Sequence, residues 1–132
     1  ADAVASPVVA VAASPGIPPG TLAAVSAALS EGGRQVVPVA DRPGLVLMRL
    51  LAMLANEAYE AALTGVADLD AIDAAMVAGV AYPRGPAAWA RATGLAEILT
   101  VLDNLHAVTG DMRYRASLGL RLAVEEEAVG TA

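Results

Sequence analysis

The chain has 132 residues, and 8 basic against 14 acidic side chains give a formal net charge of −6 at pH 7. Every basic residue is arginine, cysteine is absent and only one histidine occurs. These counts exclude a disulfide framework, a cysteine nucleophile and a Schiff-base lysine, and they leave us expecting no metal site. They also argue against nucleic acid as a partner, because the arginines are scattered along an acidic chain. We expect a cytoplasmic protein.

The hydrophobic fraction of 57% raises the question of a membrane span, and residues 3–30 carry no charge. Four prolines interrupt this stretch: Pro7, Pro15, Pro18 and Pro19. Proline breaks a helix, and lipid offers no other partner for the backbone groups that it frees. The sequence therefore predicts no membrane-spanning segment.

The first forty residues predict a strand, a helix and a second strand. A short apolar run, Val8–Ala12, lies between proline-rich segments and is typical of a strand. Apolar residues at helical spacing then run from near Thr21 to Gly32-Gly33. Val36–Val39 is the second expected strand, at a sheet edge or beside a bulge because Pro38 has no N–H to donate. We expect residues 1–41 to form one short right-handed βαβ element.

Residues 42–132 predict a bundle of about five helices. The first, Gly44–Leu63, is apolar around most of its circumference, so we expect it to be mostly buried. Its narrow polar strip is made by Arg49, Asn56, Glu57 and Glu60. The other expected helices run from an Asp68 N-cap through Ala78 to a stop at Gly79, from Pro86 to Gly94, from Leu95 to Val108 and from about Ala116 to Glu127. The fold class is therefore an α-rich α/β chain with a vestigial parallel sheet.

Few residues in this sequence are candidates for catalysis or for ligand binding. The turn from Ser14 to Gly20 holds three prolines, which lack the N–H groups that a dinucleotide phosphate needs, so we expect no cofactor there. His106 is better explained as a partly exposed helix residue near Asp103 than as a general base. Glu57 and Glu60 resemble paired carboxylates, but a solvated or interface strip is the simpler interpretation.

Several segments follow one another in a recognisable order between about residues 41 and 124. They are Asp41 to Leu51, Glu57-Ala58, Gly65 to Ala67, Ile72 to Met76, Gly79 to Pro86, Gly94-Leu95 and Gly110 to Tyr114. Together they resemble the C-terminal helical domain of NAD-dependent 3-hydroxyacyl-CoA dehydrogenases. The first forty residues are similar to the end of the Rossmann domain that precedes it. Some bacterial 3-hydroxybutyryl-CoA dehydrogenases resemble a full enzyme followed by such an abbreviated Rossmann element and a second helical domain, and this chain looks like that terminal piece.

The resemblance also shows where the chain departs from the family. An asparagine of the family's catalytic site corresponds here to Met48, and a thioether makes no usable hydrogen bond to a substrate oxygen. The family's catalytic histidine and glutamate belong to Rossmann segments that no residue here matches. We therefore expect no catalytic residue, no cofactor bound by this chain, and NAD only in the parent enzyme.

The resulting hypothesis is a C-terminal region that completes and dimerises its parent dehydrogenase, meeting acyl-CoA only through the parent. Residues expected at a homodimer interface are Met48, Met53, Leu54 and Tyr59. Periodicity leaves open whether the methionines lie instead in the chain's own core. The alternatives are a self-standing module that binds acyl-CoA in an apolar groove, and an oligomerisation domain without any link to CoA.

Overall fold

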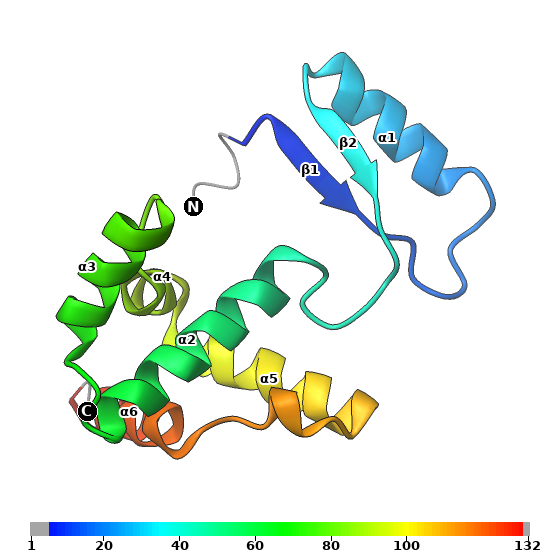
Figure 1. The fold of residues 1–132 in the computed structure, drawn as a ribbon. Coiled ribbons are helices and arrows are strands. Elements are labelled where there is room, and N and C mark those ends of the chain that lie inside the picture. The colour runs from blue at the N-terminus through cyan, green and yellow to red at the C-terminus, as the bar shows by residue number, and fades with distance from the viewer. Residues whose placement is uncertain (1–5, 131–132) are drawn as a thin grey trace. The chain divides into compact units, whose positions relative to one another are not determined.

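The computed structural model describes residues 6–130; predictions that concern residues 1–5 and 131–132 lie outside the described residues. The chain divides into two compact units, Ala1–Val46 and Leu47–Ala132. Strands and one helix make up the first unit, and the second is helical (Figure 1). The α-rich architecture expected from the sequence is therefore confirmed.

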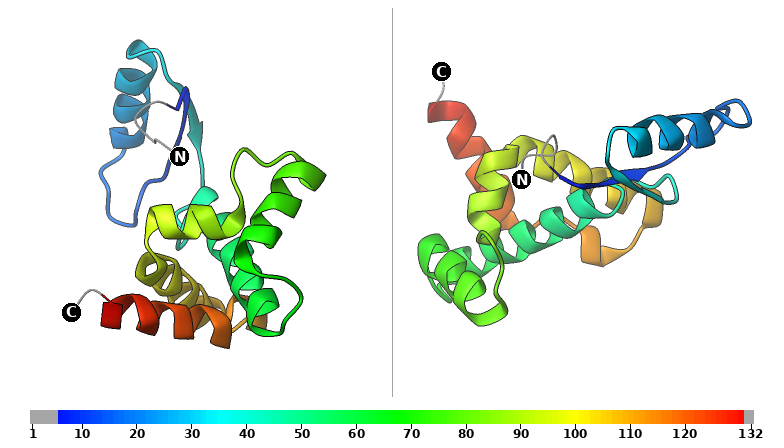
Figure 2. Two further views of the ribbon diagram at one scale, coloured as in Figure 1. Left: turned by 90° about the vertical axis from the view of Figure 1, so that its left-hand side faces the viewer. Right: turned by 90° about the horizontal axis from the view of Figure 1, so that it is seen from above.

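The first unit is a βαβ element. Strand β1 (Val8–Val11) pairs in parallel with β2 (Gln35–Pro38), and helix α1 (Thr21–Glu31) connects them. The register places Val8 opposite Gln35 and Val11 opposite Pro38. Helix α1 packs against β2, and Figure 2 shows it lying along the strands. The sheet has two strands, so both are edge strands. The missing N–H of Pro38 therefore interrupts no hydrogen bonds to a third strand.

The second unit is built around one central helix. Helix α2 (Leu47–Leu63) contacts each of α3 (Leu69–Val80), α4 (Pro86–Thr93), α5 (Leu95–Thr109) and α6 (Leu118–Gly130). A short 3-10 helix, η1 (Met112–Tyr114), lies between α5 and α6. Four neighbours cover most sides of α2, which explains why its sequence is apolar around so much of its circumference. The predicted bundle of about five helices is confirmed.

Most helix ends lie where a capping residue or a terminating glycine in the sequence predicted them. The side chain of Asp68 caps α3 by accepting a hydrogen bond from the N–H of Ala71 at 2.7 Å, as expected. Gly94 and Gly110 end α4 and α5, also as expected.

Several expected helix boundaries differ from the observed ones. Helix α2 begins at Leu47 because Gly44 and Leu45 adopt left-handed conformations, with φ of 70° and 45°. Helix α3 continues through Gly79 and ends where Ala81 takes a φ of 57°. Helix α6 begins at Leu118, two residues after the expected start at about Ala116.

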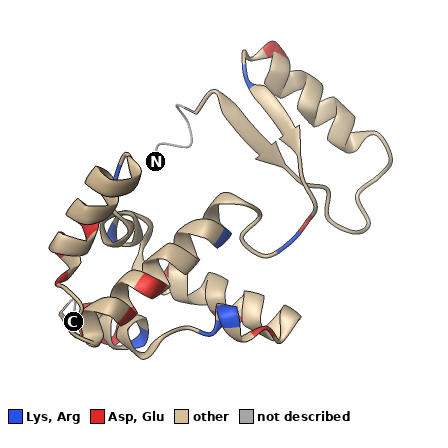
Figure 3. Ribbon diagram, in the orientation of Figure 1, with Lys and Arg blue, Asp and Glu red and all other residues tan. Residues whose placement is uncertain are grey.

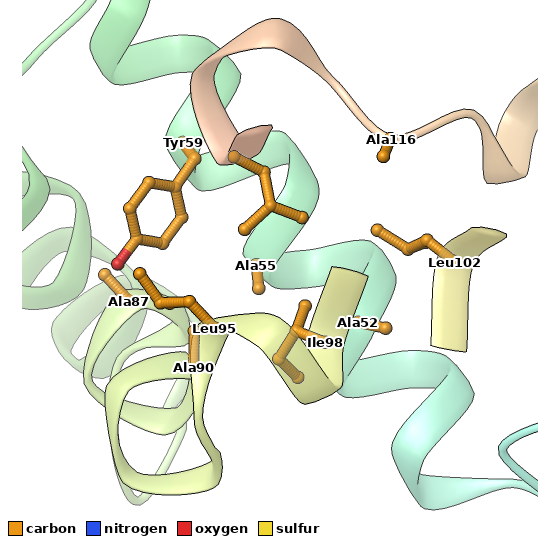
Figure 4. Packing of buried hydrophobic residues seen from close by; sticks show 10 residues of the cluster. Ala52, Ala55, Tyr59, Ala87, Ala90, Leu95, Ile98, Leu102 and Ala116 are labelled. Carbon is orange, nitrogen blue, oxygen red and sulfur yellow. The ribbon is translucent and has the colours of Figure 1, made fainter. Parts of the chain in front are cut away.

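The core of the helical unit lies between α2, α4, α5 and α6. Its largest fully buried side chains are Ile98, Leu102, Leu105 and Leu120. Ala52 and Ala55 of α2 and Ala87 and Ala90 of α4 belong to one cluster with Ile98, Leu102 and Leu120 and are themselves at most 1% exposed (Figure 4). Small residues on α2 and α4 let the backbones approach closely, while the larger side chains of α5 and α6 fill the space between them.

Candidate functional site

Met48 stands in the first turn of α2, at the position that the family resemblance assigns to an asparagine. Its side chain is partly buried and packs against the core cluster of the helical unit, as does that of Met53. The thioether therefore fills space between apolar residues. The sequence had left open whether these methionines lie in the core, and both contact the chain's own core.

The four residues expected at a dimer interface lie in different surroundings. Tyr59 is only 6% exposed and belongs to the core cluster, so the chain's own helices already cover its ring (Figure 4). Met48 and Met53 are half-buried against that cluster. Leu54 lines an open apolar hollow on the surface. A dimer interface at these four residues stays a prediction, and Met48, Met53 and Tyr59 contact the chain's own core.

The apolar hollow lies between α2, α3 and α4 and has a volume of about 160 Å³. Its lining residues are Leu54, Glu57, Ala58, Ala61, Ile72, Met76 and Pro86. Leu47 and Leu50 continue the same face of α2 and are 58% and 54% exposed. Leu47, Leu50 and the lining of the hollow together form one apolar surface, called here the α2–α3 face.

The hollows of the helical unit are small. A second one, between α2, α3 and α6, has a volume of about 210 Å³ and is lined mostly by apolar residues, Tyr59 and Leu122 among them. Pockets that enclose a drug-sized ligand usually measure roughly 300–1,000 Å³. The two hollows are therefore too small to enclose an acyl-CoA.

Asp73 of α3 binds the first turn of α4, whose Pro86 lines the apolar hollow. Its carboxylate accepts hydrogen bonds from the N–H groups of Ala87, at 2.7 Å, and Ala88, at 2.8 Å. It thus caps α4 from α3, and Arg91 lies 3.5 Å from the same group. A Cβ on Gly85 would come within 2.2 Å of the Asp73 side chain, so this position requires glycine. Sequence reasoning missed this role, because the partners lie 14 and 15 residues away.

The polar strip of α2, expected to be solvated or to lie at an interface, is partly buried in the chain's own fold. Asn56 is 5% exposed; its side-chain oxygen accepts from the N–H of Ser117 at 2.7 Å, and its amide donates to the carbonyl of Arg115 at 3.3 Å. Glu60 accepts from the N–H of Gly119 at 3.4 Å. These side chains bind the backbone that leads into α6, and that fixes where α6 begins. Glu57 is exposed, as expected.

His106 lies near the end of α5 and is half-buried. Its Nδ1 is 3.1 Å from the carbonyl oxygen of Asp111. Asp103, expected near His106 on the same helix face, pairs with Arg121 at 2.6 Å. The N–H of Arg113 donates to the Asp111 carboxylate at 3.0 Å and, with the Arg113 guanidinium, lowers the pKa of Asp111 from its ordinary value. The contacts of His106 are those of a helix end.

The comparisons with known proteins agree with this architecture. A family model described as the C-terminal domain of 3-hydroxyacyl-CoA dehydrogenase matches residues 44–132. The chain therefore belongs to this family of helical dehydrogenase domains. It is 44% identical over 93 residues to the 3-hydroxyadipyl-CoA dehydrogenase of Escherichia coli (strain K12), and 38% identical over 106 residues to a probable 3-hydroxybutyryl-CoA dehydrogenase of Bacillus subtilis (strain 168).

Solved structures extend the likeness to the βαβ unit. The 3-hydroxybutyryl-CoA dehydrogenase from Escherichia coli K12 matches 95% of this chain with a TM-score of 0.85 and 38% identity, over 26% of its own length. The (S)-3-hydroxybutyryl-CoA dehydrogenase from Ralstonia eutropha matches 96% with a TM-score of 0.83 and 31% identity, over 44% of its length.

The chain corresponds to only part of these relatives. It spans 20% of the Escherichia coli 3-hydroxyadipyl-CoA dehydrogenase and 37% of the Bacillus subtilis protein, and the matches cover 70% and 80% of the chain itself.

Within residues 6–130, no helix combines the length and the apolar character that crossing a bilayer demands.

Proposed function

We propose that this chain is a structural, dimerising C-terminal region of a 3-hydroxyacyl-CoA dehydrogenase and does not itself catalyse the reaction. The parent enzyme, placed in the cytoplasm, would oxidise a 3-hydroxyacyl-CoA to the 3-ketoacyl-CoA with NAD. The observation that carries the docking role is the α2–α3 face, where exposed leucines lead into an apolar hollow. Apolar patches of this kind on a small domain mark surfaces where another protein packs.

Met48 supports the non-catalytic part of the proposal. The family resemblance puts a hydrogen-bonding asparagine at this position, near the reacting carbon's oxygen. The thioether of Met48 offers only a weak acceptor, and it packs against the core of its own unit. A side chain with these properties contributes packing and cannot hold a substrate oxygen in position.

The α2–α3 face fits a second helical domain of the same kind. Leu47, Leu50 and Leu54 repeat at intervals of three and four residues, which places them along one stripe of α2. A stripe with this spacing packs side by side with another helix. A symmetric dimer brings the same stripe from both copies together, and is the commonest arrangement of soluble homo-oligomers.

Sedimentation equilibrium of the 132-residue chain tests the docking role. We expect a dimer, twice the chain mass of 13.2 kDa, at micromolar concentration. Leu50→Asp should give a monomer, because it places a charge at the centre of the stripe. Val66→Asp is the matched control, since Val66 is 75% exposed outside α2 and should leave the dimer intact. A wild-type monomer, or equal effects of the two variants, would contradict the proposal.

The non-catalytic role has its own test. Incubation of the chain with acetoacetyl-CoA and NADH should give no loss of NADH absorbance beyond the protein-free control. A 3-hydroxyacyl-CoA dehydrogenase assayed in parallel shows that the reagents are active. Measurable turnover by the chain would refute the assignment of Met48 to a packing role.

A further inference from the structure

The second hollow of the helical unit combines an apolar floor with exposed leucines. It lies where the end of α2 and the start of α3 meet α6, and its volume is about 210 Å³. Leu69 and Ala123 line it, together with Leu63 and Leu122, which are 47% and 38% exposed. It is called here the α6 hollow. It shares no lining residue with the hollow of the α2–α3 face, so it is a separate candidate for an interaction surface.

Acidic side chains from the ends of three helices surround the α6 hollow. Glu126 of α6 is one of its lining residues. Asp68 and Asp70, at the start of α3, are exposed and flank a lining leucine in the sequence. Glu60 of α2 accepts a hydrogen bond from the N–H of Gly119, another lining residue. Figure 3 shows acidic residues, in red, on α2 and near the start of α3. The rim therefore places negative charge beside an apolar surface.

Most of this negative charge is not paired with a cation of the same chain. Arg91 lies 3.8 Å from Asp70. Among residues 6–130, no arginine lies within ion-pair distance of Glu60, Asp68 or Glu126. Glu126 also lies towards the C-terminal end of α6, whose last turn contains no basic residue. A helix carries partial negative charge at that end, so a cation supplied by a partner is stabilising there.

The charge of the rim decides between the possible occupants. A second copy of this chain carries a net charge of −6 and brings further negative charge to an acidic rim, which is unfavourable. The complementary partner has apolar side chains for the hollow and lysine or arginine beside them. The walls of the hollow are helices, and apolar grooves of this kind bind the apolar face of an amphipathic helix.

We propose that the α6 hollow docks a basic amphipathic helix of a partner protein. Leucines spaced three and four residues apart on that helix enter the hollow. Basic side chains beside the leucines pair with Glu126 and with the acidic start of α3, and they fix the orientation of the helix. This role is additional to dimerisation and does not depend on it, because it uses a different surface.

Fluorescence anisotropy of a labelled synthetic peptide, titrated with the 132-residue chain, tests the proposal. The probe is a peptide of about 18 residues, long enough for about five helical turns, with leucines along one face and lysines beside them. A matched peptide has glutamate in place of every lysine. We expect the lysine peptide to bind and the glutamate peptide not to bind. Binding should weaken when KCl rises from ~50 to ~200 mM, because the charges are screened.

Three variants locate the bound peptide. Leu122→Asp should weaken binding of the lysine peptide by about tenfold or more, because it buries a charge against the leucines although it adds a negative charge. Glu126→Arg reverses one charge at the rim and should weaken binding by about fivefold. Glu97→Arg is the matched control, because Glu97 is exposed on α5 and does not line the hollow. It changes the net charge equally and should change the affinity by less than about twofold.

Circular dichroism establishes that each variant is folded, and Leu63→Asp replaces Leu122→Asp if the latter does not fold. The proposal is overturned if the lysine peptide does not bind, or if the two peptides bind alike. Equal effects of the Glu126 and Glu97 variants would also overturn it. If Leu122→Asp converts a dimer to a monomer in sedimentation equilibrium, a second copy occupies the hollow and the proposal is wrong.

Discussion

The βαβ unit and the helical unit differ in how well each covers its own apolar side chains. Every fully buried residue among residues 6–130 lies between Leu51 and Leu120, inside the helical unit. In the βαβ unit, Val8, Val25 and Val37 are 44%, 45% and 39% exposed. Two parallel strands and one helix are too few to enclose a core, whereas α2 is surrounded by four helices. Burial of apolar side chains therefore stabilises mainly the helical unit.

The sharpest test of this difference compares one buried and one exposed side chain. Leu102 is fully buried, and Leu102→Ala should lower the free energy of unfolding by about 2–5 kcal/mol. Val25→Ala in the βαβ unit should change it by about 0.5 kcal/mol or less. Urea unfolding followed by far-UV circular dichroism reports on both units and measures both changes. Similar effects of the two variants would contradict the comparison.

A pair of glycines tests how closely α2 and α6 approach. A Cβ on Gly119 would lie 2.2 Å from the backbone oxygen of Tyr59, and backbone cannot move aside at small cost. Gly119→Ala should therefore destabilise the helical unit by about 1–3 kcal/mol. Gly79, inside α3, has no atom within 4 Å of such a Cβ, so Gly79→Ala should stabilise by about 0.5–1 kcal/mol. Thermal unfolding of both variants should show opposite signs, and equal signs would show that α6 is placed wrongly.

The cap on α4 tests whether one carboxylate links α3 to the rest of the helical unit. Asp73→Ala leaves two backbone N–H groups without their acceptor and should cost about 1–3 kcal/mol. Asp70 is the matched control because its side chain is 94% exposed and lies 3.8 Å from the same arginine, Arg91. Asp70→Ala should change stability by about 0.5 kcal/mol or less. Urea midpoints distinguish the two; equal losses would assign the effect to the ion pairs and not to the cap.

Sequence reasoning succeeded where the signal is local and failed where partners are distant. Helix spacing, the Asp68 cap and the terminating Gly94 and Gly110 all act within a few residues, so the order of elements could be predicted. The roles of Asn56 and Asp73 could not, since Asn56 binds Ser117 across 61 residues. Until the helices are packed, a polar residue on α2 cannot be assigned to solvent or to another segment's backbone.

The arginines around Tyr114 were missed for the same reason. Arg49 and Arg113 are far apart in the sequence, so the sequence shows no cluster of basic residues that would indicate their contact. Only the packing of η1 beside α2 brings both guanidinium groups to one ring. Contacts between distant segments are thus visible only in the structure, whereas Met48 was recognised by its place in an ordered motif.

The smallest expected effect is an alkaline loss of stability confined to the helical unit. Burial raises the pKa of Tyr59, and the neighbouring Arg91 offsets part of this rise. Above pH ~10 an unfolded tyrosine releases its proton while the folded Tyr59 still holds its own, so the folded state binds more protons and stability falls as pH rises. This contribution is fully present below pH ~10 and is lost as pH rises through the folded pKa. Tyr59→Phe removes the ionisable group and should flatten the curve between about pH 9 and pH 11, measured by urea unfolding with Trp89 fluorescence. Tyr82→Phe serves as the control for a tyrosine outside the core, and if both variants titrate like the wild type, the core around Tyr59 admits more water than its 6% exposure indicates.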